Sequence, residues 1–181
     1  MFDINSLFSD FVTGVNNVIS DLAAHKAESE AKAVITLSGS DLSFANNSYS
    51  SVSVNNVDVD THGFYDNSNF CIKIPESLDG SDFLISAGIR FVSSAHIRGV
   101  YLFIGTYDAN MTPLGEYAGR AGFDANGENS RITAVPRSIT GMIFNVPAGT
   151  RIKCVVSVTM ADESDYGISA SDLTFLAIKK I

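Results

Sequence analysis

The residue types that most often carry out chemistry are present in this sequence, but not at spacings that build an active site. The three histidines are His25, His62 and His96, and none stands in a pattern that pairs it with a nucleophile or a metal. The Gly-x-x-x-x-Gly-Lys, His-Glu-x-x-His and Gly-x-Ser-x-Gly motifs are also absent. A triad assembled from distant positions would leave no such motif. The sequence nevertheless favours a protein that is not an enzyme and that uses no cofactor.

The best candidate for a metal site is the tract Asp58-Val59-Asp60-Thr61-His62-Gly63, which is similar to the start of a calcium-binding loop. His62 stands where such a loop needs an oxygen ligand, and Asn69 occupies the twelfth position, where a bidentate Glu is required. We therefore predict no metal site. Acidic loops at 124–128 and 162–165 fit either a weak cation site or ordinary solvated loop tips.

The two cysteines, Cys71 and Cys154, lie in apolar runs typical of β-strands. Their spacing matches neither a metal site nor a framework of several disulfides. We predict two buried thiols rather than a disulfide.

Charge and composition exclude several classes of partner. The net charge is -8, with 20 acidic and 12 basic residues and no run of Lys and Arg to neutralise phosphates, so nucleic-acid binding is not expected. No basic segment followed by an apolar core marks a secretory signal, and no apolar run is long enough to insert into a membrane. With 181 residues, 45% of them hydrophobic, the chain is expected to form one well-cored domain and an appendage.

That appendage is an expected N-terminal helix within residues 1–33. Its apolar residues recur at alternating steps of four and three, as in a heptad seam. They are Ile4, Phe8, Phe11, Val15, Val18 and Leu22. Additional apolar residues widen the stripe, which favours a three-helix bundle or insertion into a partner. The stripe could also pack onto the protein's own domain, or lie on a membrane surface, although no basic residue precedes Lys26.

From residue 34 to residue 181 the pattern changes to short runs of β-branched and aromatic residues separated by polar turns. The expected strands are 34–37, 49–54, 70–74, 83–91, 100–107, 131–135, 142–146, 151–160 and 173–178. Many short strands with almost no helix between them predict a mainly β fold, a jelly-roll β-sandwich.

Two of these runs, 100–104 and 173–178, are apolar on both faces of the strand. A strand in a sandwich turns only one face to the core, so its other face needs a cover. A second copy of the chain would provide one, and we predict an assembly with cyclic symmetry. The predicted interface between copies consists of Tyr101, Phe103, Phe175 and Ala177. A loop or the N-terminal helix could cover the same residues instead.

The order of several tracts resembles the trimeric jelly rolls of the complement globular-head and tumour-necrosis-factor superfamily, especially those of bacteriophage virion proteins. Residues 60–66 are similar to its Asp-Thr-x-Gly tract, 83–91 to its Gly-x-Tyr-x-Ile-Ser-Ala strand, and 146–152 to its apolar-x-Ala-Gly-Asp turn. Phe83 replaces the usual Tyr, Asp82 the preceding Gly, and Thr150 the usual Asp. The resemblance implies a homotrimer whose last strand lies near the three-fold axis.

We therefore predict a phage structural protein on the virion surface. Its helix would trimerise or insert into a capsid, collar or tail partner, and its knob would project and bind host-surface glycans. The predicted ligand contacts are loop residues with stacking area or adaptable hydrogen bonds. They are Tyr107, Asp108, Asn110, Asn126 and Glu128. The alternatives are a capsid decoration or cement protein with no host ligand, and a polysaccharide hydrolase.

Overall fold

The computed structural model describes residues 12–23, 30–45, 48–92, 97–124, 136–160, 166–168, 170 and 174–181. Its strands are β1 (Lys32–Thr36), β2 (Leu42–Phe44), β3 (Tyr49–Val52), β4 (Asn56–Asp60), β5 (Tyr65–Asp66), β6 (Cys71–Lys73), β7 (Ser81–Val92), β8 (Ile97–Tyr107), β9 (Pro113–Asp124), β10 (Pro136–Val146), β11 (Arg151–Met160), β12 (Tyr166–Ile168) and β13 (Phe175–Lys180). A single-turn 3-10 helix, η1 (Glu76–Leu78), precedes β7.

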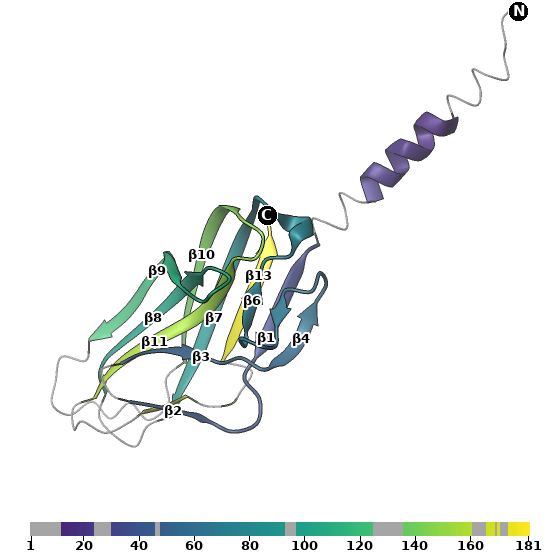
Figure 1. Ribbon diagram of the computed structural model, residues 1–181. Helices are drawn as coiled ribbons and strands as arrows, with labels where there is room; N and C mark the ends of the chain where they lie inside the picture. The colour runs from purple at the N-terminus through teal and green to yellow at the C-terminus, as the bar shows by residue number, and fades with distance from the viewer. Residues whose placement is uncertain are drawn as a thin grey trace, which may run out of the picture.

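The strands form two antiparallel sheets that face each other (Figure 1). Within the described residues, the first sheet has the order β2-β12-β7-β13-β1-β4, with β10 also paired to β7. The second sheet has the order β5-β6-β11-β8-β9, with β3 also paired to β11. Several neighbours in these orders are distant in the chain, as in a jelly roll. The predicted mainly β jelly-roll fold is confirmed.

The core lies between the two sheets and consists of alternate residues of the long strands. Ile85 and Ile89 of β7 and Leu102 and Ile104 of β8 are fully buried. Phe64 and Phe83 meet edge to face, with ring centroids 6.1 Å apart and an interplanar angle of 87°. The periodicity of two in the sequence therefore positions the core, and the residues between these core positions form the two outer faces of the sandwich.

Most expected strands are present, with shifted ends. The expected strand at 70–74 begins one residue later because Phe70 has a positive φ of 50°, outside the β region. The expected strand at 131–135 and Leu173 lie outside the described residues. β9 was not predicted, since its sequence PLGEYAGRAGFD has no regular apolar alternation.

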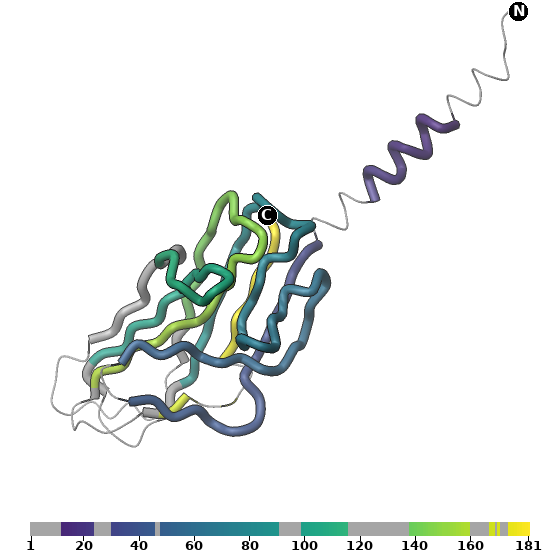
Figure 2. The backbone as a smooth tube through the Cα atoms, viewed as in Figure 1, coloured from purple at the N-terminus to yellow at the C-terminus, as the bar shows by residue number. Residues whose placement is uncertain are grey.

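The first and last strands of the sandwich are neighbours. β1 pairs with β13 antiparallel, with Lys32 opposite Lys179. The amide of Lys180 donates to the carbonyl of Ala31 at 2.9 Å. Because β1 begins at Lys32, the sandwich begins slightly before the expected boundary at residue 34. The tube in Figure 2 shows this start of β1 and the C-terminus at the same end of the sandwich.

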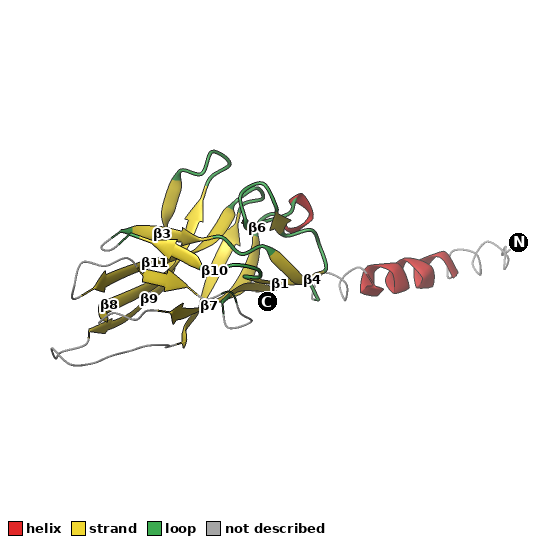
Figure 3. Cartoon of the chain, turned by 90° about the horizontal axis from the view of Figure 1, so that it is seen from below, coloured by secondary structure: helices red, strands yellow, loops and turns green. Residues whose placement is uncertain are grey.

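Residues 12–23 form the N-terminal helix, and all of them are exposed. Figure 3 shows this helix, in red, outside the sandwich. The rest of the expected helical segment, including Ile4, Phe8 and Phe11, lies outside the described residues. No helix in the described part of the chain is long and apolar enough to cross a membrane.

Candidate binding surfaces

The outer surface of the first sheet, which we call the first-sheet face, carries apolar side chains from four adjacent strands. In register, Thr140 of β10, Ser86 of β7, Ala177 of β13 and Val34 of β1 form one row across it. Met142 and Phe144 follow Thr140 along β10 at steps of two, so they lie on the same face, and they are 52% and 62% exposed. They alternate with Ile139 and Ile143, which are buried. The first-sheet face therefore combines the exposed apolar side chains of Met142 and Phe144 with a polar pair, Ser86 and Thr140, whose hydroxyl oxygens lie 2.8 Å apart.

The predicted interface residues do not share one face. Phe175 and Ala177 are half-buried on the first-sheet face. Tyr101 and Phe103 belong to β8 and lie on the outer surface of the second sheet, the second-sheet face, on the opposite side of the sandwich. Phe103 is only 4% exposed, because other residues of the same chain cover it. One three-fold interface on a single face could include only one of these two pairs.

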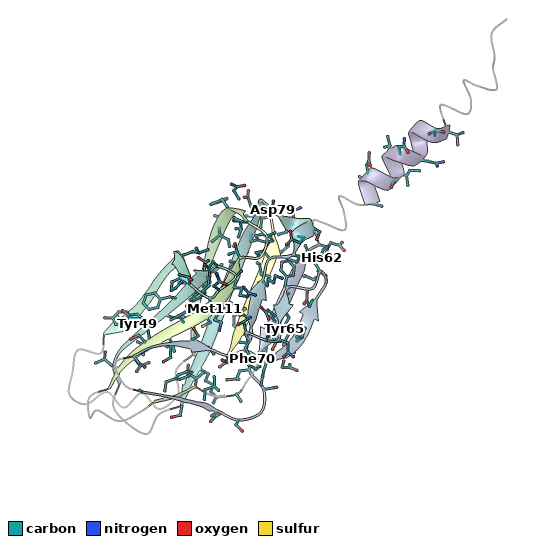
Figure 4. All side chains as sticks on the ribbon, viewed as in Figure 1. Tyr49, His62, Tyr65, Phe70, Asp79 and Met111 are labelled. Atoms are coloured by element: carbon teal, nitrogen blue, oxygen red, sulfur yellow. The ribbon has the colours of Figure 1, made fainter. Side chains whose placement is uncertain are left out.

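Aromatic side chains cluster on the second-sheet face. The ring centroid of Tyr49, from β3, lies 5.7 Å from that of Phe103, and the Tyr101 ring stacks on Phe103 with a centroid distance of 6.4 Å. Figure 4 shows Tyr49 on the part of the sandwich formed by β8 and β11. Tyr49 is 70% exposed, so one side of its ring faces solvent.

Beside this cluster lies a groove of about 240 Å³, which we call the aromatic groove. It is lined by Tyr49, Phe103, Gly105, Thr106, Tyr107, Pro113, Gly115 and Val155. A Cβ atom at Gly105 would lie 3.1 Å from the Tyr107 hydroxyl oxygen and 3.3 Å from a methyl carbon of Val155. Tyr107 therefore lies across the backbone of Gly105, and a larger residue there would displace it.

Comparison with known proteins identifies the fold only. No protein-family model matches the chain, and no curated protein matches its sequence. Among solved structures, it is similar to Eiger TNF from S. frugiperda, with a TM-score of 0.56 and 10% sequence identity, over 84% of this chain and 92% of that chain. The chain has a TNF-like jelly-roll fold. The tumour-necrosis-factor part of the expected resemblance is confirmed at the level of fold, and the phage origin stays a prediction.

Within this jelly roll, the predicted ligand residues have different surroundings. Tyr107 lines the aromatic groove. The Asp108 carboxylate accepts the amides of Asn110 and Thr112, both at 2.8 Å, so it closes the β8–β9 turn. These hydrogen bonds, with that of Thr112 first, lower the pKa of Asp108. Asn110 is exposed. Asn126 and Glu128 lie outside the described residues.

The tract that is similar to a calcium loop has a structural use in this jelly roll. The Asp60 carboxylate accepts the backbone amides of His62, Gly63, Phe64 and Tyr65, at 2.8–3.2 Å. Gly63 has a φ of +73°, a conformation that favours glycine. Thr61 Oγ1 accepts the Lys32 amide at 2.9 Å, which ties the loop to β1. Asp60 therefore organises the entry to β5, close to His62, which is labelled in Figure 4.

A second carboxylate fastens the edge of the second sheet. Arg151 Nε donates to Asp66 Oδ2 at 2.9 Å, and Arg151 also donates to the carbonyl of Asp108 at 3.3 Å. The Asp66 carboxylate accepts the side chain and amide of Asn69 and the amide of Ser68 as well. Desolvation is the largest single influence on Asp66 and acts to raise its pKa, but these hydrogen bonds together lower the pKa below its usual value.

Both cysteines are free and buried, as predicted. Burial raises the pKa of Cys71 to about 11 and that of Cys154 to about 12. Both thiols therefore stay protonated and unreactive at neutral pH.

The seam residues of the N-terminal helix that lie within the described range, residues 12–23, are all exposed to solvent. Val15 is 41% exposed, Val18 66% and Leu22 68%. Val12 and Ile19, beside them, are also exposed. Because every described residue of the helix is exposed, the seam does not pack onto the sandwich of its own chain there.

Proposed function

We propose that this protein is a homotrimeric display protein, in which the first-sheet face and the N-terminal helix hold an assembly together and the jelly roll projects as a binding knob. One observation carries the proposal: the chain exposes apolar residues on two separate surfaces, at Met142 and Phe144 on the knob and at Val18 and Leu22 on the helix. Large apolar patches on soluble proteins commonly mark interaction sites.

The first-sheet face suits contacts between knobs. Fully burying a side chain such as Phe or Met contributes about 1.5–3 kcal/mol, and a cyclic trimer would repeat each contact three times. Phe175 and Ala177, on the last strand, lie on this face. Their location agrees with the expectation that the last strand lies near the three-fold axis.

The helix seam suits a three-helix bundle or insertion into a larger partner. Its stripe includes Val12 and Ile19 beside Val15, Val18 and Leu22, which is wider than the seam of a two-helix coiled coil. Three such helices could enclose the stripe, and the same surface could instead dock into a groove of a capsid, collar or tail protein.

We further propose that this assembly is part of a phage virion and that its knobs bind glycans on the host surface. Support comes from the sequence resemblance to phage versions of the fold and from the aromatic groove on the second-sheet face, which stays accessible if the first-sheet face forms the trimer. Three knobs would also bind a repeated surface ligand with avidity. A decoration protein would assemble through the same surfaces but bind no glycan.

Substitutions in the full-length helix test the assembly role. Val18→Asp combined with Leu22→Asp places two charges in the seam, and Ser20→Asp, on the opposite side of the helix, is the matched control. We expect the double variant to lose incorporation into purified virions, measured by quantitative mass spectrometry, while its circular dichroism spectrum keeps the β signal. The control should incorporate normally. Equal incorporation of the double variant would refute the anchoring role.

A further inference from the structure

We propose that the aromatic groove binds a pyranose ring that carries a carboxylate, as found in acidic polysaccharides, and that Lys153 pairs with this carboxylate. This inference rests on the proposed role in glycan binding and makes it specific. It depends on three properties of the groove: its floor, its exposed aromatic side chains and the charge at its border.

Gly105 shapes the floor of the groove. With no side chain at this position, the Tyr107 ring lies across the strand, and an added Cβ would come within 3.2 Å of its Cε2. Val155, on the neighbouring strand β11, completes the floor. The volume of about 240 Å³ is smaller than the usual 300–1,000 Å³ of pockets for drug-sized ligands. A single sugar ring is a ligand of suitable size and shape.

The side chains around the floor match the two kinds of surface on a sugar. The C–H groups of a pyranose form an apolar face that packs on aromatic rings, while its hydroxyl groups need polar partners. Tyr49 and Tyr107 supply both, because each tyrosine has an apolar ring and a polar hydroxyl. Tyr49 is 70% exposed, so its ring is available for such a contact.

Lys153 gives the groove its charge preference. It lies directly across from Gly105 in the register of β11 and β8. Its neighbours Ile152 and Cys154 point into the core, so its own side chain points outward on the second-sheet face. Cross-strand positions on one face are about 5 Å apart. Its ammonium group can therefore reach a ligand in the groove.

This ammonium group has no anionic partner in the described part of the chain. Arg151, the other cation of this strand, is already engaged with Asp66. In a protein with a net charge of -8, a free cation beside an aromatic floor favours a ligand with a single negative charge. A sugar carboxylate meets this requirement, whereas a neutral sugar would leave Lys153 without a partner.

Isothermal titration calorimetry of the full-length protein with tetragalacturonate and with its methyl ester tests the proposal, because the ester keeps the sugar rings and replaces each charged carboxylate with a neutral methyl ester. We expect the acid to bind about tenfold more tightly, the equivalent of one charge-assisted hydrogen bond. Lys153→Gln should remove this difference and leave binding of the ester unchanged. Lys73→Gln, at an exposed lysine on β6, one strand further from Gly105 than Lys153, is the matched control and should behave like the parent.

Tyr49→Ser separates the stacking contribution from the charge, since this exposed side chain can be removed without opening the core. It should weaken binding of both ligands about fivefold or more. Equal binding of acid and ester by the parent protein, or no binding of either at millimolar concentration, would overturn the proposal. Light scattering of the same samples measures the molecular mass and so separates the sugar-binding proposal from the trimer proposal. A trimer that binds neither ligand refutes only sugar binding in the groove. A single copy that binds the acid refutes only the assembly.

Discussion

Both outer faces of the sandwich carry apolar residues, but these residues are shielded from solvent to different extents. On the second-sheet face, Phe103 is 4% exposed and is covered within its own chain, in part by Tyr49. On the first-sheet face, Met142 and Phe144 stay more than half exposed in a single copy. The outward side of a strand that is apolar on both sides can therefore be buried by residues of its own chain or by another copy of the chain. The second-sheet face fits the first explanation, and the first-sheet face fits the second.

The largest effect is expected when the first-sheet face is made polar. Met142→Asp combined with Phe144→Asp places charges where the proposed interface buries apolar side chains. Losing about 1.5–3 kcal/mol for each residue should weaken association more than a hundredfold. Sedimentation velocity across a dilution series measures the change. Because both side chains are exposed in the single copy, the far-ultraviolet circular dichroism spectrum should stay that of the parent.

A pair of alanine substitutions distinguishes the two faces directly. Phe103→Ala leaves a cavity under Tyr49 and should lower the free energy of unfolding by about 3 kcal/mol at every protein concentration. Phe144→Ala should lower it only at concentrations where copies associate, because the contact it removes lies between copies. Urea denaturation at low and high protein concentration measures both effects. The comparison fails if the two variants respond to concentration in the same way.

The smallest effect is expected from the ion pair that fastens the edge of the second sheet. The pKa of Asp66 is lowered in the folded protein, so its carboxylate stabilises the fold above the pKa it has in the unfolded chain. That contribution disappears as the pH falls through the lowered folded pKa. Asp66→Asn should therefore make unfolding less sensitive to pH below about pH 4. Glu76→Gln, at an exposed carboxyl in η1, is the control and should leave the acid limb unchanged.

Many short runs of β-branched and aromatic residues, separated by polar turns, predicted the jelly roll, and core residues such as Ile85, Ile89, Leu102 and Ile104 lie within those runs. The sequence could not show which outer face is covered. That depends on Tyr49 reaching Phe103 from a strand 54 residues earlier in the chain, and such a contact leaves no local pattern. The end of the expected strand 100–107 was predicted correctly, since β8 ends at Tyr107 and Asp108 then accepts amides two and four residues ahead, as is common for Asp in turns.

The aromatic groove was only partly predictable. Tyr107 was selected for its side chain, but Tyr49 and Lys153 were not, because they approach the groove from other strands. One local signal was present: Gly105 directly follows the apolar run 100–104 inside a strand, and a glycine inside a strand often marks a place where another group comes close. The role of Asp60 was likewise hidden, because a carboxylate that binds backbone amides and one that binds calcium occur in similar sequences.

The central claim, that sister copies cover the first-sheet face, is tested most directly by the mass of the full-length protein in solution. Sedimentation equilibrium at micromolar concentration measures it without reference to shape. Our account predicts three copies per particle. A particle of one copy at that concentration would contradict it, since Met142, Phe144 and the helix seam would then remain exposed without a cover.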